Sequence, residues 1–142
     1  MEHQNPADEE IRHILTTVRT VAVAGASDKS DRPVYGVSEF LQARGVLTIP
    51  VNPRLAGKTV LGETAVARLQ DITVPVDMVD CFVNPARVGP IVDDAIAIGA
   101  KIVWMQLDVI DEDAAARARA AGLTVVMDRC PAIEWRRLGL DS

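Results

Sequence analysis

Two features of the sequence predict an α/β domain with a doubly wound, parallel sheet of five strands and a leading helix. Short β-rich runs alternate with helix-like stretches along the chain, and such alternation is typical of parallel sheets. Three helix-like stretches also run into a glycine that is followed at once by a β-rich run, at Gly45, Gly99 and Gly122. Glycine readily takes the left-handed conformation that ends many helices. Each junction therefore indicates a helix-to-strand turn.

The leading helix is expected at residues 8–17, because apolar residues recur there at helical spacing behind an acidic first turn. It belongs to an acidic segment, residues 1–20. We expect this segment to pack on a single domain formed by residues 21–142.

The next three elements follow from short patterns. Residues 21–24 are uniformly apolar and end at Gly25, as expected for a strand buried on both faces. A helix is expected at residues 33–44, because proline at its first position is a helix-start signal. The second strand is expected at residues 46–51 and is ended by Asn52-Pro53.

The middle of the chain contains the third strand. Residues 59–61 are expected to be extended, and residues 63–69 are expected to form a short helix. The third strand, residues 76–83, lies between a proline and Asn84-Pro85. A helix at residues 86–98 follows, because its apolar residues recur at helical spacing.

The last third of the chain repeats the alternation. The fourth strand is expected at residues 101–107, and an alanine-rich helix that begins with three acidic residues is expected at 111–121. The fifth strand, residues 123–127, and a short closing helix, residues 132–138, complete the predicted domain.

The predicted strand order is 3-2-1-4-5, which right-handed crossovers allow. In this order the third strand lies at an edge, and the direction of winding changes between the first and fourth strands. Ligands of open parallel sheets bind beyond the carboxyl ends of the strands at such a point. We therefore expect function to lie in the strand-end loops.

Composition narrows the possible partners. The chain has 142 residues, 49% of them hydrophobic, and a net charge of −5, with no cluster of basic residues and only 4% aromatic residues. These values argue against a nucleic-acid partner. No apolar run approaches the roughly 20 residues that span a bilayer, so we expect a cytoplasmic protein without a membrane partner. Cys81 and Cys130 lack metal-ligand spacing and are expected to be thiols, with no metal bound.

A glycine-led loop follows the first strand and leads into a helix. It reads Gly25-Ala26-Ser27-Asp28-Lys29, and it matches the dinucleotide fingerprint G-x-G-x-x-G poorly, because Ser27 stands at the second glycine position. Backbone amides at a helix amino terminus can hold a phosphate. A tight turn that needs Gly25, with Gly36 allowing close helix packing, explains the loop equally well.

The end of the second strand carries a cation where many NAD sites carry an acid. The residues there are Asn52, Pro53 and Arg54. An arginine without a nearby carboxylate suits a phosphorylated ribose, as in NADP or coenzyme A. A solvated turn is the alternative interpretation.

The end of the third strand contributes a weaker signal. Val83 and Pro85 are apolar and stand where they can wall one side of an adenine. For such a short pattern, a strand end followed by a helix start is the better interpretation.

Taken in order, these segments resemble the small, stand-alone CoA-binding protein family over about residues 21–138. The residues that carry the resemblance are Gly25-Ala26-Ser27-Asp28-Lys29, Arg32-Pro33-Val34-Tyr35-Gly36, Pro50-Val51-Asn52-Pro53, Val76-Asp77-Met78-Val79-Asp80 and Met127-Asp128-Arg129-Cys130-Pro131. That family is similar in turn to the CoA-binding domain of the succinyl-CoA synthetase α subunit. The resemblance implies a Rossmann-like fold that binds coenzyme A or an acyl-CoA along the strand ends.

The resemblance also implies a role for each part of the site. The diphosphate lies on the first loop, the phosphorylated ribose on the second and the adenine on the third. The cofactor-binding residues implied are Gly25, Ala26, Ser27, Lys29, Arg32, Tyr35, Gly36, Asn52, Pro53, Arg54, Val83, Asn84 and Pro85. Asp108 departs from the pattern, because many relatives are expected to have glycine there.

No catalytic residue is predicted. The two histidines, His3 and His13, lie in the leading segment, so no histidine-activated nucleophile can be assembled from the strand-end loops. We expect a carrier, sensor or regulatory module for coenzyme A, with a protein partner or self-association left open. The alternatives are an NADP-dependent or acyl-CoA-handling enzyme completed by a partner, and an interaction module whose nucleotide site has lapsed.

Overall fold

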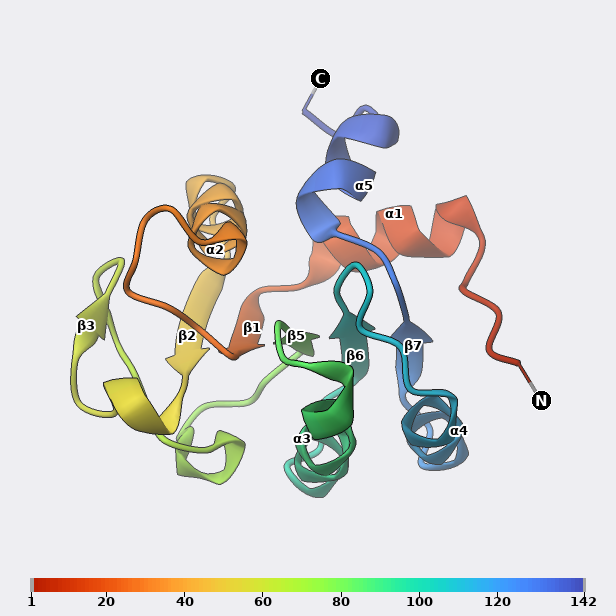
Figure 1. The fold of residues 1–142 in the computed structure, drawn as a ribbon. Coiled ribbons are helices and arrows are strands. Elements are labelled where there is room, and N and C mark those ends of the chain that lie inside the picture. Colours follow the sequence, from red (N-terminus) through yellow and green to blue (C-terminus); the bar gives the residue numbers. More distant parts are fainter. Residues whose placement is uncertain (1, 142) are drawn as a thin grey trace.

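The computed structural model describes residues 2–141 and has a five-stranded parallel sheet at its centre (Figure 1). The strands stand in the order β2-β1-β5-β6-β7. Their bounds are Thr20–Ala24 for β1, Leu47–Val51 for β2, Met78–Cys81 for β5, Ile102–Met105 for β6 and Thr124–Val126 for β7. The predicted fold class, a doubly wound parallel sheet with a leading helix, is confirmed.

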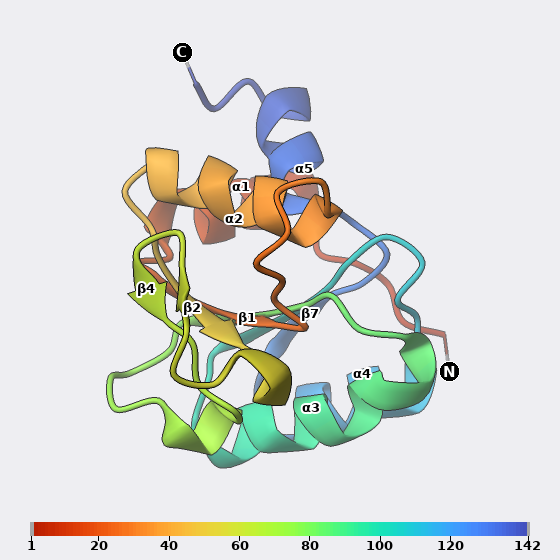
Figure 2. The same ribbon diagram turned by 60° about the vertical axis from the view of Figure 1, so that its left-hand side comes forward.

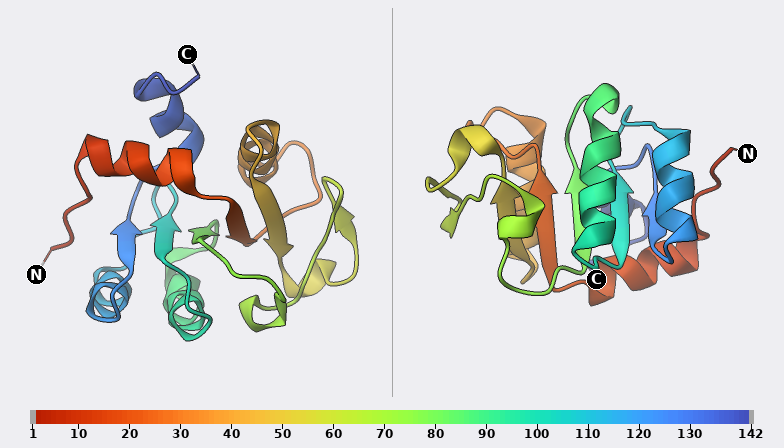
Figure 3. Two further views of the ribbon diagram at one scale, coloured as in Figure 1. Left: turned by 180° about the vertical axis from the view of Figure 1, so that it is seen from behind. Right: turned by 90° about the horizontal axis from the view of Figure 1, so that it is seen from below.

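Helices cover both faces of the sheet. Two of them, α3 and α4, lie side by side on one face, and the other three lie on the opposite face (Figures 1 and 3). The bounds are Asp8–Thr17 for α1, Pro33–Ala43 for α2, Pro85–Ala97 for α3, Glu112–Ala120 for α4 and Pro131–Arg137 for α5. Each face has its own apolar core, because successive residues of a buried strand point to opposite sides.

The strand order corrects one part of the prediction. The third strand of the sequence, β5, lies between β1 and β6 and not at the edge beyond β2, so the observed order is 2-1-3-4-5 rather than 3-2-1-4-5. The physical reason is visible in β2, where Pro50 lacks the amide that a second neighbouring strand would require. All four residues of β5 are buried, as a central position demands.

The segment after β2 differs from the predicted helix at residues 63–69. It contains a small hairpin of β3, Thr59–Val60, and β4, Glu63–Thr64, with short 3-10 turns η1, Pro53–Leu55, and η2, Leu69–Asp71. Leu61 and Gly62 form the hairpin turn, with φ of 50° and 83°. Positive φ at both central residues is the geometry of a tight two-residue hairpin, which excludes a helix there.

The direction of winding changes between β1 and β5. The chain leaves β1 towards β2, and it later returns past β1 to β5. This places the loops after β1, β2 and β5 next to each other at the carboxyl ends of the strands, where Figure 2 shows the β1–α2 loop rising above the sheet. The candidate site lies at this edge.

Candidate functional site

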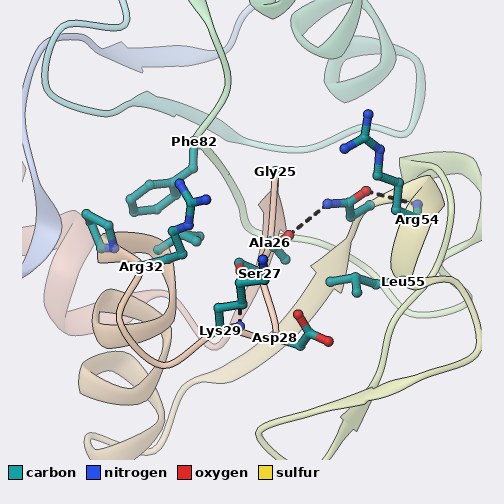
Figure 4. A pocket seen from close by; sticks show the side chains of 12 residues that line it. Gly25, Ala26, Ser27, Asp28, Lys29, Arg32, Arg54, Leu55 and Phe82 are labelled. Carbon is teal, nitrogen blue, oxygen red and sulfur yellow. Dashed lines mark hydrogen bonds between the residues drawn. The ribbon is translucent and has the colours of Figure 1, made fainter.

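A pocket of about 500 Å³ opens at the carboxyl ends of β1 and β2, beside the start of α2 (Figure 4). The loops after β1, β2 and β5 all contribute to it. Its lining consists of Gly25, Ala26, Ser27, Asp28, Lys29, Arg32, Pro33, Val34, Asn52, Arg54, Leu55 and Phe82. We call it the loop pocket. It brings the predicted first and second loops together, as the resemblance implies.

Gly25 shapes this pocket through its backbone. Its φ is +81°, and a Cβ placed on it would lie 2.2 Å from the carbonyl oxygen of Phe82. No larger residue can occupy this position without moving the backbone of the neighbouring strand. The interpretation of Gly25 as a residue required by a tight turn is therefore correct. Gly36 is different, because a Cβ there would meet no heavy atom within 4 Å, so it does not serve close helix packing.

The backbone amides of the first loop divide into two groups. The Gly25 and Ala26 amides donate to the carbonyl oxygen of Val51, at 3.0 and 3.4 Å. They hold the β1–α2 loop against the end of β2 and are not directed at a ligand. The next two amides, those of Ser27 and Asp28, donate no hydrogen bond within the described residues. The amides available to an anion therefore lie one step further along the loop.

Asn52 connects the two loops. Its side-chain amide donates to the Ala26 carbonyl oxygen at 2.8 Å, and its side-chain oxygen accepts from the Arg54 amide at 3.0 Å. Both ends of the Asn52 side chain are thus engaged inside the protein. Its function in the pocket is to position the β1–α2 loop and the start of η1.

The charge of the loop pocket is positive. Lys29, Arg32 and Arg54 line it, and none of the three forms an ion pair within residues 2–141. Asp28 is the one carboxylate in the lining. Three unpaired cations beside free amides and the amino end of an eleven-residue helix form a surface suited to a multiply charged anion.

A second pocket, of about 280 Å³, adjoins the first. Gly25 and Asn52 belong to both linings. The second pocket extends toward η2 and α3, and its remaining lining residues are Ala24, Val51, Pro53, Ala67, Arg68, Leu69, Val83, Arg87, Ile91 and Asp94. We call it the α3 pocket. It is mostly apolar, with two arginines and one carboxylate.

The structure brings most of the predicted site residues into these two pockets. Four of the thirteen line neither pocket. Tyr35 packs instead on the small core formed by Leu55, Val60 and Ala65. Gly36 is an exposed residue of α2. Asn84 caps α3, where its side chain accepts from the Ala86 amide, and Pro85 begins that helix. The predicted roles of these four as ligand contacts remain predictions.

Several lining residues were not identified from the sequence. Phe82 and Leu55 bring apolar surface into the loop pocket, and Arg68 and Arg87 bring charge into the α3 pocket. Arg87 carried a sequence signal, because a cation in the first turn of a helix is electrostatically unfavourable unless an anion offsets it. Phe82 and Leu55 carried none, since apolar residues at strand ends are ordinary core residues.

Asp80 lies in β5, in the middle of the sheet, between Val23 of β1 and Trp104 of β6. It is fully buried, and neither of its carboxyl oxygens has a hydrogen-bond partner among residues 2–141; the same holds for the side-chain oxygen of Gln106. Burial raises the pKa of Asp80 well above its usual value. Cys81 and Cys130 are buried free thiols.

Asp108 follows β6 and has φ of +66°. This backbone conformation explains why glycine is expected at this position in many relatives. Glycine takes this left-handed conformation without cost, and aspartate is one of the few other residues that tolerate it. The Asp108 amide donates to the side chain of Asp128, which has φ of +60° at the end of β7.

The fold and the site define this chain as a Rossmann-like α/β domain with a cation-lined pocket at the point where the winding direction changes. Residues 19–136 match the CoA binding domain family, and the chain belongs to that family. The resemblance described from the sequence is thereby confirmed. No helix among the described residues has the length and apolar character needed to cross a membrane.

Proteins similar to this chain include one curated relative and several solved structures. Uncharacterized protein YneT of Bacillus subtilis (strain 168) is 35% identical over 127 residues, which cover 89% of this chain and 93% of YneT. A hypothetical protein from Pyrococcus horikoshii OT3 is 37% identical with a TM-score of 0.89, over 97% of this chain and 99% of that chain.

A more distant structural neighbour is a large enzyme. The dinucleotide forming Acetyl-coenzyme A synthetase 1 of Ca. Korarchaeum cryptofilum matches with a TM-score of 0.67 at 20% identity. The match covers 77% of this chain and 26% of the synthetase chain. At this identity the likeness shows a shared fold.

Proposed function

We propose that this protein binds coenzyme A or an acyl-CoA in the loop pocket and acts as a single-domain carrier, sensor or regulatory module. The observation that carries the proposal is the combination of three unpaired cations with the free amides of Ser27 and Asp28. All three side chains are exposed and none is neutralised by a carboxylate among the described residues, so their charge is available to a ligand. Their free state fits the charge of a nucleotide diphosphate.

The diphosphate is assigned to the Ser27 and Asp28 amides, with Lys29 and Arg32 beside it. Gly25 and Ala26 contribute by holding the loop against Val51. The Gly25 and Ala26 amides themselves do not bind the diphosphate in this assignment, because both donate hydrogen bonds to the Val51 carbonyl oxygen. The ligand-facing amides are the later ones.

The phosphorylated ribose is assigned to Arg54, and the adenine to the α3 pocket. Arg54 follows β2 at the place where an acid would select NAD, and the described lining of the loop pocket has no carboxylate from that segment. Val83 contributes apolar surface to the α3 pocket, and Arg87 adds a cation to its lining. Both pockets meet at Gly25 and Asn52, so one extended ligand can occupy both.

A binding role without chemistry is supported by the side chains of the two pockets. Their described linings contain neither histidine nor cysteine. His3 is engaged with Asn5 and Arg119, and His13 is an exposed residue of α1. The lining residues can hold and orient a charged ligand, and they offer no activated nucleophile.

Isothermal titration with coenzyme A, dephospho-CoA, NADP and NAD tests the proposal. We expect coenzyme A to bind tightest, and dephospho-CoA to bind about tenfold or more weakly, because it lacks the charge-assisted hydrogen bond to Arg54. In Arg54→Gln this difference should disappear. The matched control is Arg19→Gln, which removes an exposed cation from the amino end of β1.

Each other outcome has a defined meaning. Equal affinity for coenzyme A and dephospho-CoA refutes the assignment of Arg54. Preference for NADP over coenzyme A favours the enzyme alternative. Failure of all four ligands to bind favours an interaction module with a lapsed site.

A further inference from the structure

One wall of the α3 pocket is formed by a single face of α3. Arg87, Ile91 and Asp94 all line the pocket, and their spacing places them in one row along the helix. Because α3 connects the parallel strands β5 and β6, it begins at the carboxyl ends of the strands and runs back towards their amino ends (Figure 3). The row therefore leads away from the loop pocket.

The row carries opposite charges at its two ends. Arg87 belongs to the first turn of α3, at the carboxyl ends of the strands, where Gly25 and Asn52 line both pockets. Asp94 follows seven residues later, about 10 Å further along the helix axis. A ligand that extends from the loop pocket into the α3 pocket thus meets a cation first and a carboxylate at the far end.

Neither charged group has a partner within residues 2–141. Arg87 and Asp94 form no ion pair there, and the Asp94 carboxylate accepts no hydrogen bond. Arg68, the other cation of the lining, differs because Asp71 lies 3.8 Å from it. Asp94 is half-buried, so its carboxylate has lost part of its hydration without a replacement from the protein. Such a group favours a ligand that donates a hydrogen bond to it.

This order of groups matches an adenine nucleotide, and here the inference rests on the proposed function, which places the adenine in the α3 pocket. The anionic part of the ligand lies at the Arg87 end, beside the loop pocket. Leu69, Val83 and Ile91 offer apolar surface to the faces of the base. The group that adenine can present beyond them is its 6-amino group, which is a hydrogen-bond donor.

We propose that Asp94 determines the specificity for the base, because its carboxylate accepts a hydrogen bond from the 6-amino group of the adenine. An ionised carboxylate only accepts hydrogen bonds. A base whose amino hydrogens are missing therefore finds no partner at Asp94, and a nitrogen lone pair in that place is repelled by the negative charge. The pocket thus selects a nucleotide by the donor on its base as well as by its phosphates.

Isothermal titration with coenzyme A and 1,N6-etheno-coenzyme A tests this assignment. In the analogue, a two-carbon bridge joins N1 and N6 of the adenine and removes both amino hydrogens, while the rest of the molecule is unchanged. We expect the parent protein to bind the analogue about tenfold or more weakly than coenzyme A, because the charge-assisted hydrogen bond to Asp94 is lost.

Asp94→Asn separates the hydrogen bond from the added bulk of the bridge. Asparagine has nearly the same size as aspartate, and its amide nitrogen can donate to the bridged N6. The preference for coenzyme A should therefore fall to about twofold or less. Asp93→Asn is the matched control, because it removes the same charge one residue away and Asp93 lines neither pocket. It should keep the full preference, and a circular dichroism melt confirms that both variants are folded.

The outcomes separate the two proposals. If coenzyme A and the analogue bind the parent protein equally well, the assignment of Asp94 is wrong and the proposed function stands. If the preference is the same in Asp94→Asn as in the parent, the bulk of the bridge explains it and the assignment is also wrong. If neither ligand binds the parent protein, both proposals fail.

Discussion

Gly25 is the residue on which the shape of the candidate site depends most. Its backbone passes so close to Phe82 that a side chain has no room, and its φ is in the left-handed region. We expect Gly25→Ala to lower the free energy of unfolding by at least about 2 kcal/mol, from backbone strain and the clash together. Gly25→Val would disrupt the fold in the same way. It therefore does not test ligand binding.

Gly36 provides the matched control within the same loop-and-helix unit. It lies in α2 with open space where a Cβ would stand. Gly36→Ala should raise the free energy of unfolding by about 0.5–1 kcal/mol, because alanine is the better helix former. Urea denaturation of both variants measures the two effects. Equal free energies of unfolding for Gly25→Ala and Gly36→Ala would contradict the close approach of Gly25 to the Phe82 backbone.

Asp80 predicts a pH dependence of stability. Burial raises its pKa in the folded protein, so the folded carboxyl stays protonated where the unfolded one, with pKa near 3.9, has ionised. The unfolded state then binds fewer protons. The free energy of unfolding consequently falls as the pH rises from about 4 towards the folded pKa, by up to about 1.4 kcal/mol per pH unit.

Asp80→Asn removes this titration while keeping the shape of the side chain. We expect the variant to gain stability relative to the parent as the pH rises from about 4 to about 7. Urea denaturation across that range measures the difference. A constant difference between the two proteins would show that Asp80 does not titrate abnormally.

At the scale of elements, the segment before α1 protects an edge of the sheet. The Asn5 side chain donates to the Met127 carbonyl oxygen at 2.9 Å and accepts from the Met127 amide at 2.8 Å. It thereby supplies both hydrogen bonds that a neighbouring strand would supply beyond β7. Edge strands that lack such cover are prone to pair with other chains.

Asn5→Ala should lower the free energy of unfolding by about 1–3 kcal/mol, because it leaves two backbone groups of the buried Met127 without partners. Gln4→Ala, at an exposed neighbouring position, is the control and should change stability little. Thermal melts compare the two. Identical midpoints for Asn5→Ala and the parent would contradict the edge-capping role.

The helices and strands of the sheet were largely predictable, because their apolar periodicity and start signals are local. The order of the strands in the sheet was harder to predict, because it depends on which strand the chain pairs with after each crossover. Pro50 nevertheless favours an edge position for β2, and this signal argues against the order 3-2-1-4-5. The hairpin after β2 was missed because its strands are only two residues long and because leucine, which takes the positive φ at Leu61, does not signal such a turn.

Trp135 makes a contact that depends on how two helices pack and that no local sequence pattern specifies. It is 9% exposed, packs edge-on against Phe40 of α2, and donates to Asp141. Arg44, the residue that directly follows α2, also binds Asp141 and lies over the Phe40 ring. This cluster joins α5 and the residues after it to α2. Trp135 is therefore a buried contact between helices.

On the scale of the whole molecule, the candidate site is assembled where three loops meet. The motif after β1 was visible in the sequence, because glycine, serine and basic residues follow one another there. The contributions of Leu55 and Phe82 depend on strand order and hairpin geometry, which no local pattern specifies. The engagement of the Gly25 and Ala26 amides with Val51 likewise follows from the approach of β2.

The central claim is that a nucleotide diphosphate binds the later amides of the β1–α2 loop beside three free cations. A crystal structure of the complex with coenzyme A tests it most directly. The account predicts the diphosphate within hydrogen-bond distance of the Ser27 and Asp28 amides, with Arg54 at the phosphorylated ribose. A diphosphate bound away from these amides would contradict the account.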